Sequence, residues 1–147
     1  MTYQHILVPV DGSDLSLGVV EHVVSLAKAF NSKITVTQVM TLDPYVASEY
    51  LSEGQTNDLI ERARQFIYEN IERTKVQLQL HGLAVESILL EGENISRTLT
   101  HAVDTLGVDL IVLSSHGRSG IKKLLMGSVA QNLITEATVP VFVVKAH

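Results

Sequence analysis

The sequence predicts an α/β fold in which a doubly wound, five-stranded parallel sheet carries helices on both faces. One pattern in the sequence predicts it. Short apolar, β-branched runs alternate with longer stretches of helical periodicity, which is the pattern of parallel strands joined by crossover helices. The chain has 147 residues, 46% of them hydrophobic, and no internal repeat or low-complexity tract, so we expect one domain over residues 1–147 with a single sizeable core.

Five apolar runs are the predicted strands. In chain order they are His5 to Val10, Lys33 to Val39, Val85 to Leu90, Leu110 to Ser114 and Val141 to Val144. If the first strand is central, and the chain winds outward through the second and third before returning to the fourth and fifth, the strand order is 3-2-1-4-5.

Four stretches between these strands have apolar residues at helical spacing. The first carries Leu15, Val19, Val23, Leu26, Ala27 and Phe30, and ends at Asn31 and Ser32. The second runs from about Asn57 to Gln79, with Leu59, Ala63, Phe66, Ile67 and Ile71 facing inward and Gly82 as a C-terminal cap. The third carries Ile95, Leu99, Ala102, Val103 and Leu106, between a cap at Asn94 or Ser96 and Gly107. The fourth runs from Ser128 to about Ala137, and Pro140 prevents its continuation.

One connection, Met40 to Thr56, is too long for a simple turn between a strand and a helix. It is either a lid over a site or a surface excursion with a turn of helix, and the surface excursion is the favoured interpretation.

Composition excludes several classes of protein. The chain has no cysteine, so disulfides, thiolate metal sites and a cysteine nucleophile are excluded, and a reducing compartment is expected. A net charge of −5 argues against nucleic-acid binding, because phosphate neutralisation needs a basic face. The N-terminal apolar run is short and lacks a basic leader, and no stretch approaches the length of a membrane span. We therefore expect a cytoplasmic protein.

The most informative segment is Leu113 to Ile134, which runs from an apolar strand through a basic loop rich in glycine and serine into a helix. The free N–H groups and the dipole at a helix N-terminus attract anions. Glycines at positions 117, 120 and 127 allow the main chain to approach a ligand closely. The segment therefore predicts a phosphate-binding loop.

The predicted topology places this loop beside the end of the first strand. In a doubly wound sheet, ligands bind beyond the carboxyl ends of the strands where the strand order reverses, here between the first and fourth strands. The residues expected to line this crevice are Pro9, Val10 and Asp11 on one side and Ser114, Ser115, His116 and Gly117 on the other.

Several of these residues have a structural interpretation beside the functional one. Asp11 either binds a ribose hydroxyl or a metal-bound water, or forms a helix cap or an Asx-turn; the two roles are about equally expected. Ser128 either donates its hydroxyl to a phosphate while also capping the fourth helix, or only caps the helix. Arg118 forms a cationic cluster with Lys122 and Lys123 that suits an oligophosphate, although solvated surface is the commoner role.

Catalytic and metal-binding motifs are missing from the sequence. His116 is a lone loop histidine, and the other histidines have no pair at ligand spacing, so a metal site made by the protein alone is not expected. There is no Walker A loop, no G-x-G-x-x-G after the first strand and no G-x-S-x-G nucleophile motif. The sequence therefore predicts binding rather than catalysis.

The chain resembles the universal stress protein family, and within it the ATP-binding branch. The resemblance covers the opening HILVPVDGS, the strand ITVTQV, the segment VDLIVLSSHGRSGIKKLLMGSVAQNLI and the closing VPVFVV. The family motif is a glycine, two residues, a second glycine, nine residues, then glycine followed by Ser or Thr. Gly117 and Gly127-Ser128 match its second half, whereas Ser114 stands in place of the first glycine.

The resemblance implies a Rossmann-like fold of the adenine nucleotide alpha hydrolase type and a bound nucleotide, ATP or ADP or AMP. It places adenine near Val39 and the Pro9-Val10 strand end, and ribose near Asp11 and Ser114. The phosphates would lie on Gly117, Gly127, Ser128 and Val129, near Ser115, His116 and Arg118, with Mg²⁺ or Mn²⁺ held through the phosphates. Ser114 adds a Cβ and a hydroxyl where the family's nucleotide sugar passes.

The resemblance also implies a homodimer formed through the fifth strand. Independently, Val141, Phe142, Val143 and Val144 form an apolar strand at a sheet edge, and such an edge needs covering.

Three functions are compatible with these observations. The leading hypothesis is a nucleotide-dependent regulatory or stress-survival protein. The alternatives are a slow ATPase, for which no general base is evident beyond Asp11, and a nucleotide-free dimeric interaction module, which Ser114 alone favours.

Overall fold

The sheet has the predicted topology. The computed structural model describes residues 2–13, 15, 17–41, 53–115 and 126–145. Its five strands are all parallel and lie in the order β3-β2-β1-β4-β5, which confirms the predicted order. The strands are β1 (His5–Pro9), β2 (Lys33–Met40), β3 (Val85–Glu91), β4 (Leu110–Ser114) and β5 (Val141–Val144).

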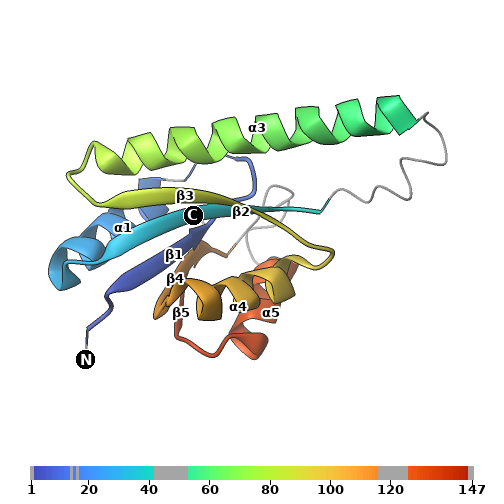
Figure 1. The fold of residues 1–147 in the computed structure, drawn as a ribbon. Coiled ribbons are helices and arrows are strands. Elements are labelled where there is room, and N and C mark those ends of the chain that lie inside the picture. Colours follow the sequence, from blue (N-terminus) through green and yellow to red (C-terminus); the bar gives the residue numbers. More distant parts are fainter. Residues whose placement is uncertain (1, 14, 16, 42–52, 116–125, 146–147) are drawn as a thin grey trace.

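Helices cover both faces of the sheet. They are α1 (Leu17–Phe30), α3 (Glu53–Gln79), α4 (Ile95–Leu106) and α5 (Ser128–Glu136). Helices α1 and α3 lie on one face, and α4 and α5 lie on the other (Figure 1). None of the helices in the described ranges is long and apolar enough to cross a membrane.

Side chains alternate along each strand between two hydrophobic cores. Ile6 and Val8 of β1 pack with α1 and α3, whereas Leu7 packs with α4 and α5. All three are fully buried, because a parallel sheet is covered on both faces. Strand β1 pairs with β2, where Pro9 lies opposite Thr37, and with β4, where Ile6 lies opposite Leu110. The carboxyl ends of β1 and β4 are therefore adjacent.

Helix α4 has the bounds and caps that the sequence predicts. The Asn94 side chain accepts a hydrogen bond from the amide of Arg97 at 2.9 Å, and Gly107 ends the helix with φ 70°. Leu99 and Val103 are buried against the sheet. Glycine suits the C-terminal position because other residues are strained at positive φ.

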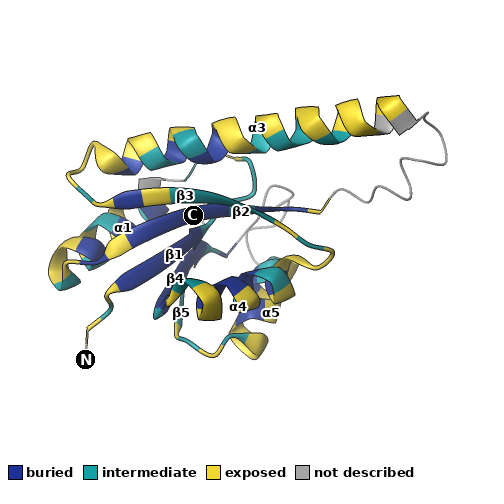
Figure 2. Ribbon diagram, viewed as in Figure 1, coloured by how far each residue is buried: buried dark blue, intermediate teal, exposed yellow. Residues whose placement is uncertain are grey.

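Helix α3 differs from the prediction. It begins at Glu53, a few residues earlier than expected, and two residues predicted to face inward face solvent: Leu59 is 41% exposed and Phe66 is 54% exposed. The buried side is centred instead on Ile71 and Leu78, both with no exposed surface. At 3.6 residues per turn, Phe66 lies about 140° and Leu59 about 120° around the helix from Ile71. The outer face of α3 is exposed along most of its length (Figure 2).

Candidate functional site

The candidate site lies at the carboxyl edge of the sheet, where β1 and β4 end side by side. The chain leaves β1 and turns toward α1, and it leaves β4 toward α5 on the opposite face. This is the position at which the strand order reverses, and open parallel sheets bind their ligands there.

The end of β1 is held by a main-chain bond and a local turn. The amide of Val10 donates to the carbonyl of Thr37 at 2.8 Å, which extends the pairing with β2 by one residue. Oδ1 of Asp11 accepts hydrogen bonds from the amide of Ser13 at 3.1 Å and from its hydroxyl at 2.5 Å. Gly12 between them has φ 95°, a conformation that favours glycine. Asp11 therefore forms the Asx-turn that was one of its two predicted roles.

The end of β4 is tied to the start of α5. The amide of Ser115 donates to the carbonyl of Val144 at 2.9 Å, and the carbonyl of Ser115 accepts from the amide of Gly127 at 2.7 Å. Two segments separated by more than ten residues are thus joined at the edge of the sheet. The bond between Ser115 and Gly127 could not be predicted, since a main-chain pairing across a loop leaves no side-chain pattern in the sequence.

Helix α5 begins without a side-chain cap among the described residues. Gly127 is the N-cap, with φ −63° and ψ 153°, and its carbonyl accepts from the amide of Gln131 at 3.1 Å. The prediction that Ser128 caps this helix is wrong, because Ser128 is the first residue inside it. The cap position is held by a glycine, which has no side chain to accept the first amides. The amides of Ser128 and Val129 belong to the first turn, which has no acceptor within the helix.

The predicted adenine-binding valine and the first turn of α5 share one apolar cluster. Val39, at the end of β2, is 8% exposed and packs in the core beneath α4 and α5, and Val129 packs against the same core. Val10 contacts the opposite core, beneath α1 and α3. Pro9 ends β1 and is partly buried. The described part of the predicted site therefore spans the sheet edge from β2 to α5.

Three predicted site residues, His116, Gly117 and Arg118, lie outside the described residues, as do Gly120, Lys122 and Lys123. Most of the connection from Met40 to Thr56 also lies outside them, although its last residues form the start of α3. Across the described ranges, no group of three or more His, Asp or Glu side chains is arranged to hold a metal ion.

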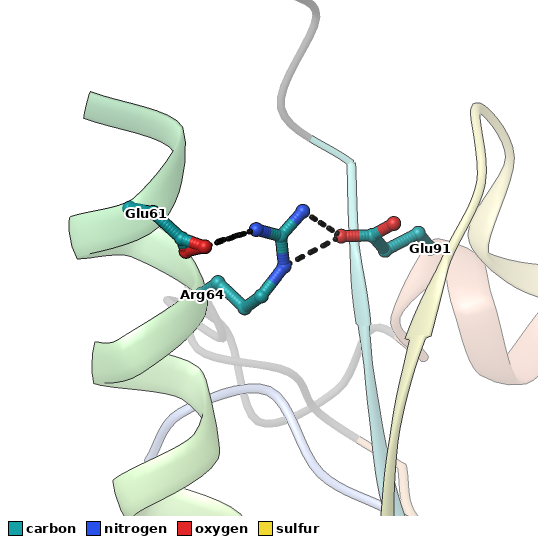
Figure 3. A network of polar contacts seen from close by, with 3 residues as sticks. All are labelled: Glu61, Arg64 and Glu91. Atoms are coloured by element: carbon teal, nitrogen blue, oxygen red, sulfur yellow. Dashed lines mark hydrogen bonds and ion pairs between the residues drawn. The ribbon is translucent and has the colours of Figure 1, made fainter. Parts of the chain in front are cut away.

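A groove lies between α3 and the carboxyl end of β3, two strands away from β1. It has a volume of about 660 Å³ and is lined by Glu61, Arg64, Gln65, Tyr68, Leu89, Leu90 and Glu91. The Arg64 guanidinium bridges α3 and β3: Nη1 lies 2.7 Å from Glu61 Oε1, and Nη2 lies 2.7 Å from Glu91 Oε1 (Figure 3). Hydrogen bonds from Arg64 to Glu91 and Glu61 raise its pKa above the ordinary value. Because both carboxylates already engage the guanidinium, the groove is a poor anion site.

The fold and this edge define a doubly wound α/β protein of the kind that binds ligands at the topological switch point. The model of the universal stress protein family matches residues 2–145. Universal stress protein MJ0531 of Methanocaldococcus jannaschii is 31% identical over 143 residues, which cover 97% of this chain and 82% of that protein. The chain belongs to the universal stress protein family.

Solved structures agree with this assignment. Protein MJ0577 of Methanocaldococcus jannaschii matches with a TM-score of 0.83 and 27% identity, covering 100% of this chain and 99% of that one. Two more distant structures, which show the fold alone, contain nucleotides. The universal stress protein from Archaeoglobus fulgidus in complex with dAMP has a TM-score of 0.66 at 20% identity, covering 99% of this chain and 100% of that one. A family member from Arabidopsis thaliana with AMP bound has a TM-score of 0.67 at 16% identity, covering 98% of this chain and 92% of that one.

Proposed function

We propose that this chain binds an adenine nucleotide, with ATP as the first candidate, at the carboxyl edge of β1 and β4. The observation that carries the proposal is the start of α5, where a glycine cap leaves the amides of Ser128 and Val129 without a side-chain acceptor among the described residues. Such a helix terminus attracts phosphate through its N–H groups and its dipole. The dAMP and AMP found in relatives of the same fold support the choice of adenine.

The residues at this edge fit the parts of such a ligand. Val39 and Val129 supply apolar surface for the base, and Pro9 and Val10 form the adjoining strand end. Asp11 retains Oδ2 as an acceptor for a ribose hydroxyl while Oδ1 holds the turn. The amides of Ser128 and Val129 would face the phosphates; the other predicted phosphate-binding residues, His116, Gly117 and Arg118, lie outside the described residues. The amide of Gly127 already donates to Ser115, so this glycine contributes a close approach rather than a donor.

The serine in place of the first motif glycine is compatible with this arrangement. Side chains alternate along a strand, and Leu113 packs into the core beneath α4 and α5, where Val39 and Val129 also lie. The side chain of Ser114 therefore points toward the α1 face, the side on which Val10 packs, and away from Val39 and Val129. This geometry favours nucleotide binding over a nucleotide-free interaction module.

We assign the chain a regulatory role in stress survival rather than an enzymatic one. Among the predicted site residues that the structure describes, Asp11 is the single ionisable side chain, and its Oδ1 is engaged by Ser13. A divalent cation, Mg²⁺ or Mn²⁺, would be held through the phosphates. Steady phosphate release from ATP that Asp11→Ala abolishes would contradict the regulatory assignment and favour a slow ATPase.

We further propose a homodimer through β5, which is an edge strand paired only with β4 in the described sheet. The side chains of Val141, Phe142 and Val143 are partly covered by α1 and α5. A second copy of the strand would satisfy the open main-chain edge. The carbonyl of Val144, at the end of β5, accepts from the amide of Ser115. Nucleotide binding at this edge would then affect dimerisation through β5.

The variant Gly127→Asp tests the proposed phosphate site. The backbone at Gly127 is extended, with φ −63° and ψ 153°, so any L-residue can adopt it. An aspartate there would cap α5, accept the first-turn amides and repel phosphate. We expect affinity for ATP with Mg²⁺, measured by titration calorimetry, to fall at least about tenfold, while fold stability is kept or raised by a few tenths of a kcal/mol.

The matched control is Asn94→Asp at the N-terminus of α4. It adds the same charge to a helix cap whose side chain already accepts from Arg97, so ATP affinity should stay unchanged. Equal loss of affinity in both variants, or none in Gly127→Asp, would contradict the site assignment.

A further inference from the structure

An apolar and charged stripe runs along the outer face of α3. Phe66, Val76 and Leu80 are 54%, 50% and 83% exposed, and the amide of Leu80 still donates to the carbonyl of Val76 at 3.1 Å. Glu69 and Arg73 lie between Phe66 and Val76. The five positions 66, 69, 73, 76 and 80 are separated by alternating steps of three and four residues. This alternation is the spacing of the contact seam in a two-helix coiled coil. We define positions 62, 66, 69, 73, 76 and 80 as the α3 stripe.

The charges of the α3 stripe are not paired with opposite charges in the described chain. The Glu69 carboxylate accepts a hydrogen bond from Gln65 at 3.1 Å, and Arg73 donates to Asn70 Oδ1. The ion pairs found among the described residues of α3 lie elsewhere on the helix, at Arg64 and Lys75. Glu69 and Arg73 are therefore available to a partner.

We propose that the α3 stripe is a self-association surface, and that its occupant is α3 of a second copy of this chain running antiparallel. The argument is symmetry. Consider a twofold axis that crosses the outer face of α3 at the level of residue 71 along the helix. Phe66 then faces Val76 of the second copy, Glu69 faces its Arg73, and Arg62 lies over its Leu80. Each of these pairs is centred on residue 71, and a twofold axis repeats each contact.

Charge complementarity is what selects a second copy over an unrelated partner. In the antiparallel register, Glu69 and Arg73 make two opposite-charge contacts per dimer. In a parallel register with equal residues opposed, Glu69 would face Glu69 and Arg73 would face Arg73, so like charges would meet. The stripe carries Arg62, Arg73 and Glu69, whereas the whole chain has a net charge of −5. Two acidic copies therefore approach with less repulsion along this stripe than at an average part of their surface.

This surface is independent of the nucleotide site and of β5. Strand β3, on which α3 packs, is at the opposite edge of the sheet from β5. If copies also pair through β5, association through α3 is a second step that increases the mass beyond the dimer. The expected interaction is weak and dependent on concentration, because a single helix face is a small interface.

Sedimentation velocity over a wide range of protein concentration tests the proposal. The wild type should show an association step that Phe66→Glu weakens at least about tenfold, since a charge would enter the apolar seam. Glu69→Arg and Arg73→Glu should each weaken it similarly by opposing like charges. The double variant Glu69→Arg/Arg73→Glu should restore association to within about threefold of the wild type, because it exchanges the two charges and keeps their complementarity.

Two controls are needed. One tests the proposed pairing register, and the other tests whether each variant keeps its fold. Leu59 is 41% exposed on the same helix, but the antiparallel register leaves it beyond the paired segment, so Leu59→Glu should keep the association step. Circular dichroism and the unfolding temperature should match the wild type in every variant, because all substituted side chains are exposed. The proposal is overturned if the wild type sediments like Phe66→Glu, if the double variant fails to recover, or if Leu59→Glu weakens association equally.

Discussion

Helices α3 and α4 are both crossover helices, yet they are attached to the sheet in different ways. Helix α4 is fixed by buried contacts: Leu99 is 1% exposed, and a side chain caps the first turn. Its last turn is also tied to β1, because Nδ1 of His5 donates to the carbonyl of Leu106 at 3.1 Å. Helix α3 is more than twice as long. It buries Ile71 and Leu78 in the core, but it also leaves large apolar side chains in solvent and meets β3 through the exposed Arg64 bridge.

An apolar residue at helical spacing does not by itself identify the buried face of a helix. In α4 the apolar residues form one narrow stripe, and that stripe is covered except at Ile95 in the first turn. In α3 they form two stripes, one around Ile71 and one that includes Phe66. Only the first is covered by the sheet. The second is what we propose as a surface for self-association.

The largest expected effect separates the two helices directly. Leu99→Ala in α4 removes a fully buried side chain and should cost about 2–5 kcal/mol of unfolding free energy. Leu59→Ala in α3 removes a side chain that is 41% exposed and should cost less than about 1 kcal/mol. Urea denaturation of both variants measures the contrast. Equal losses would show that the outer stripe of α3 contributes to the fold.

The N-terminal cap of α4 should have a smaller effect. Asn94→Ala removes the acceptor for the amide of Arg97 and should lower the unfolding free energy by about 1 kcal/mol. Asn94→Ser keeps a capping side chain and should retain most of the stability. If the alanine and serine variants unfold at the same urea concentration, the side-chain cap does not stabilise α4.

The His5 link between β1 and α4 predicts a dependence on pH. A carbonyl can only accept, so Nδ1 of His5 carries the proton that Leu106 accepts, and Nε2 accepts from the Thr35 hydroxyl at 2.7 Å. Burial, reinforced by Lys33, lowers the pKa of His5 below 6.5. The unfolded state then binds more protons, so stability is full above about pH 6.5 and declines as the pH falls toward the folded-state pKa.

The free energy of unfolding, measured at pH 7.5 and at pH 5.5, tests the predicted loss of stability at lower pH. The decline should be smaller in His5→Gln, which keeps hydrogen-bonding groups but does not titrate. His101→Gln, on the exposed side of α4, should leave the wild-type decline intact. A decline that persists unchanged in His5→Gln would assign the titration to another group.

The smallest effect is expected at the Arg64 bridge of α3. Its side chain is 40% exposed, and that of Glu91 is 50% exposed, so water screens the interaction. Arg64→Gln should shift the urea midpoint less than Asn94→Ala does. A larger shift would show that α3 depends on this bridge and would remove the contrast between the two helices.

The same contrast explains how much the sequence could predict. The strand order, the bounds of α4 and its caps at Asn94 and Gly107 follow from local patterns that the sheet then satisfies. The orientation of α3 could not be predicted, because which of two apolar stripes is buried depends on where the helix lies over β2 and β3. Tertiary placement decided that question, and propensity did not.

At the candidate site, the sequence predicted the convergence of strand ends but not the details of its bonding. The Asx-turn at Asp11 was one of two expected roles, whereas the bond from Gly127 to Ser115 had no side-chain signature. The cap of α5 was assigned one residue too late, because Ser128 is a good capping residue and glycine a less obvious one. That one-residue difference leaves the first amides of α5 without a side-chain cap among the described residues.

The most direct test of nucleotide binding is mass spectrometry of the small molecules released when the freshly purified protein is denatured, followed by titration of the refolded or nucleotide-stripped protein with ATP and Mg²⁺. We predict an adenine nucleotide, released or bound on titration at close to one per chain in the wild type and lost in Gly127→Asp. Saturation should stabilise the fold by about 2.7 kcal/mol at a hundredfold excess over the dissociation constant. No released nucleotide together with no binding at millimolar ATP would contradict the account.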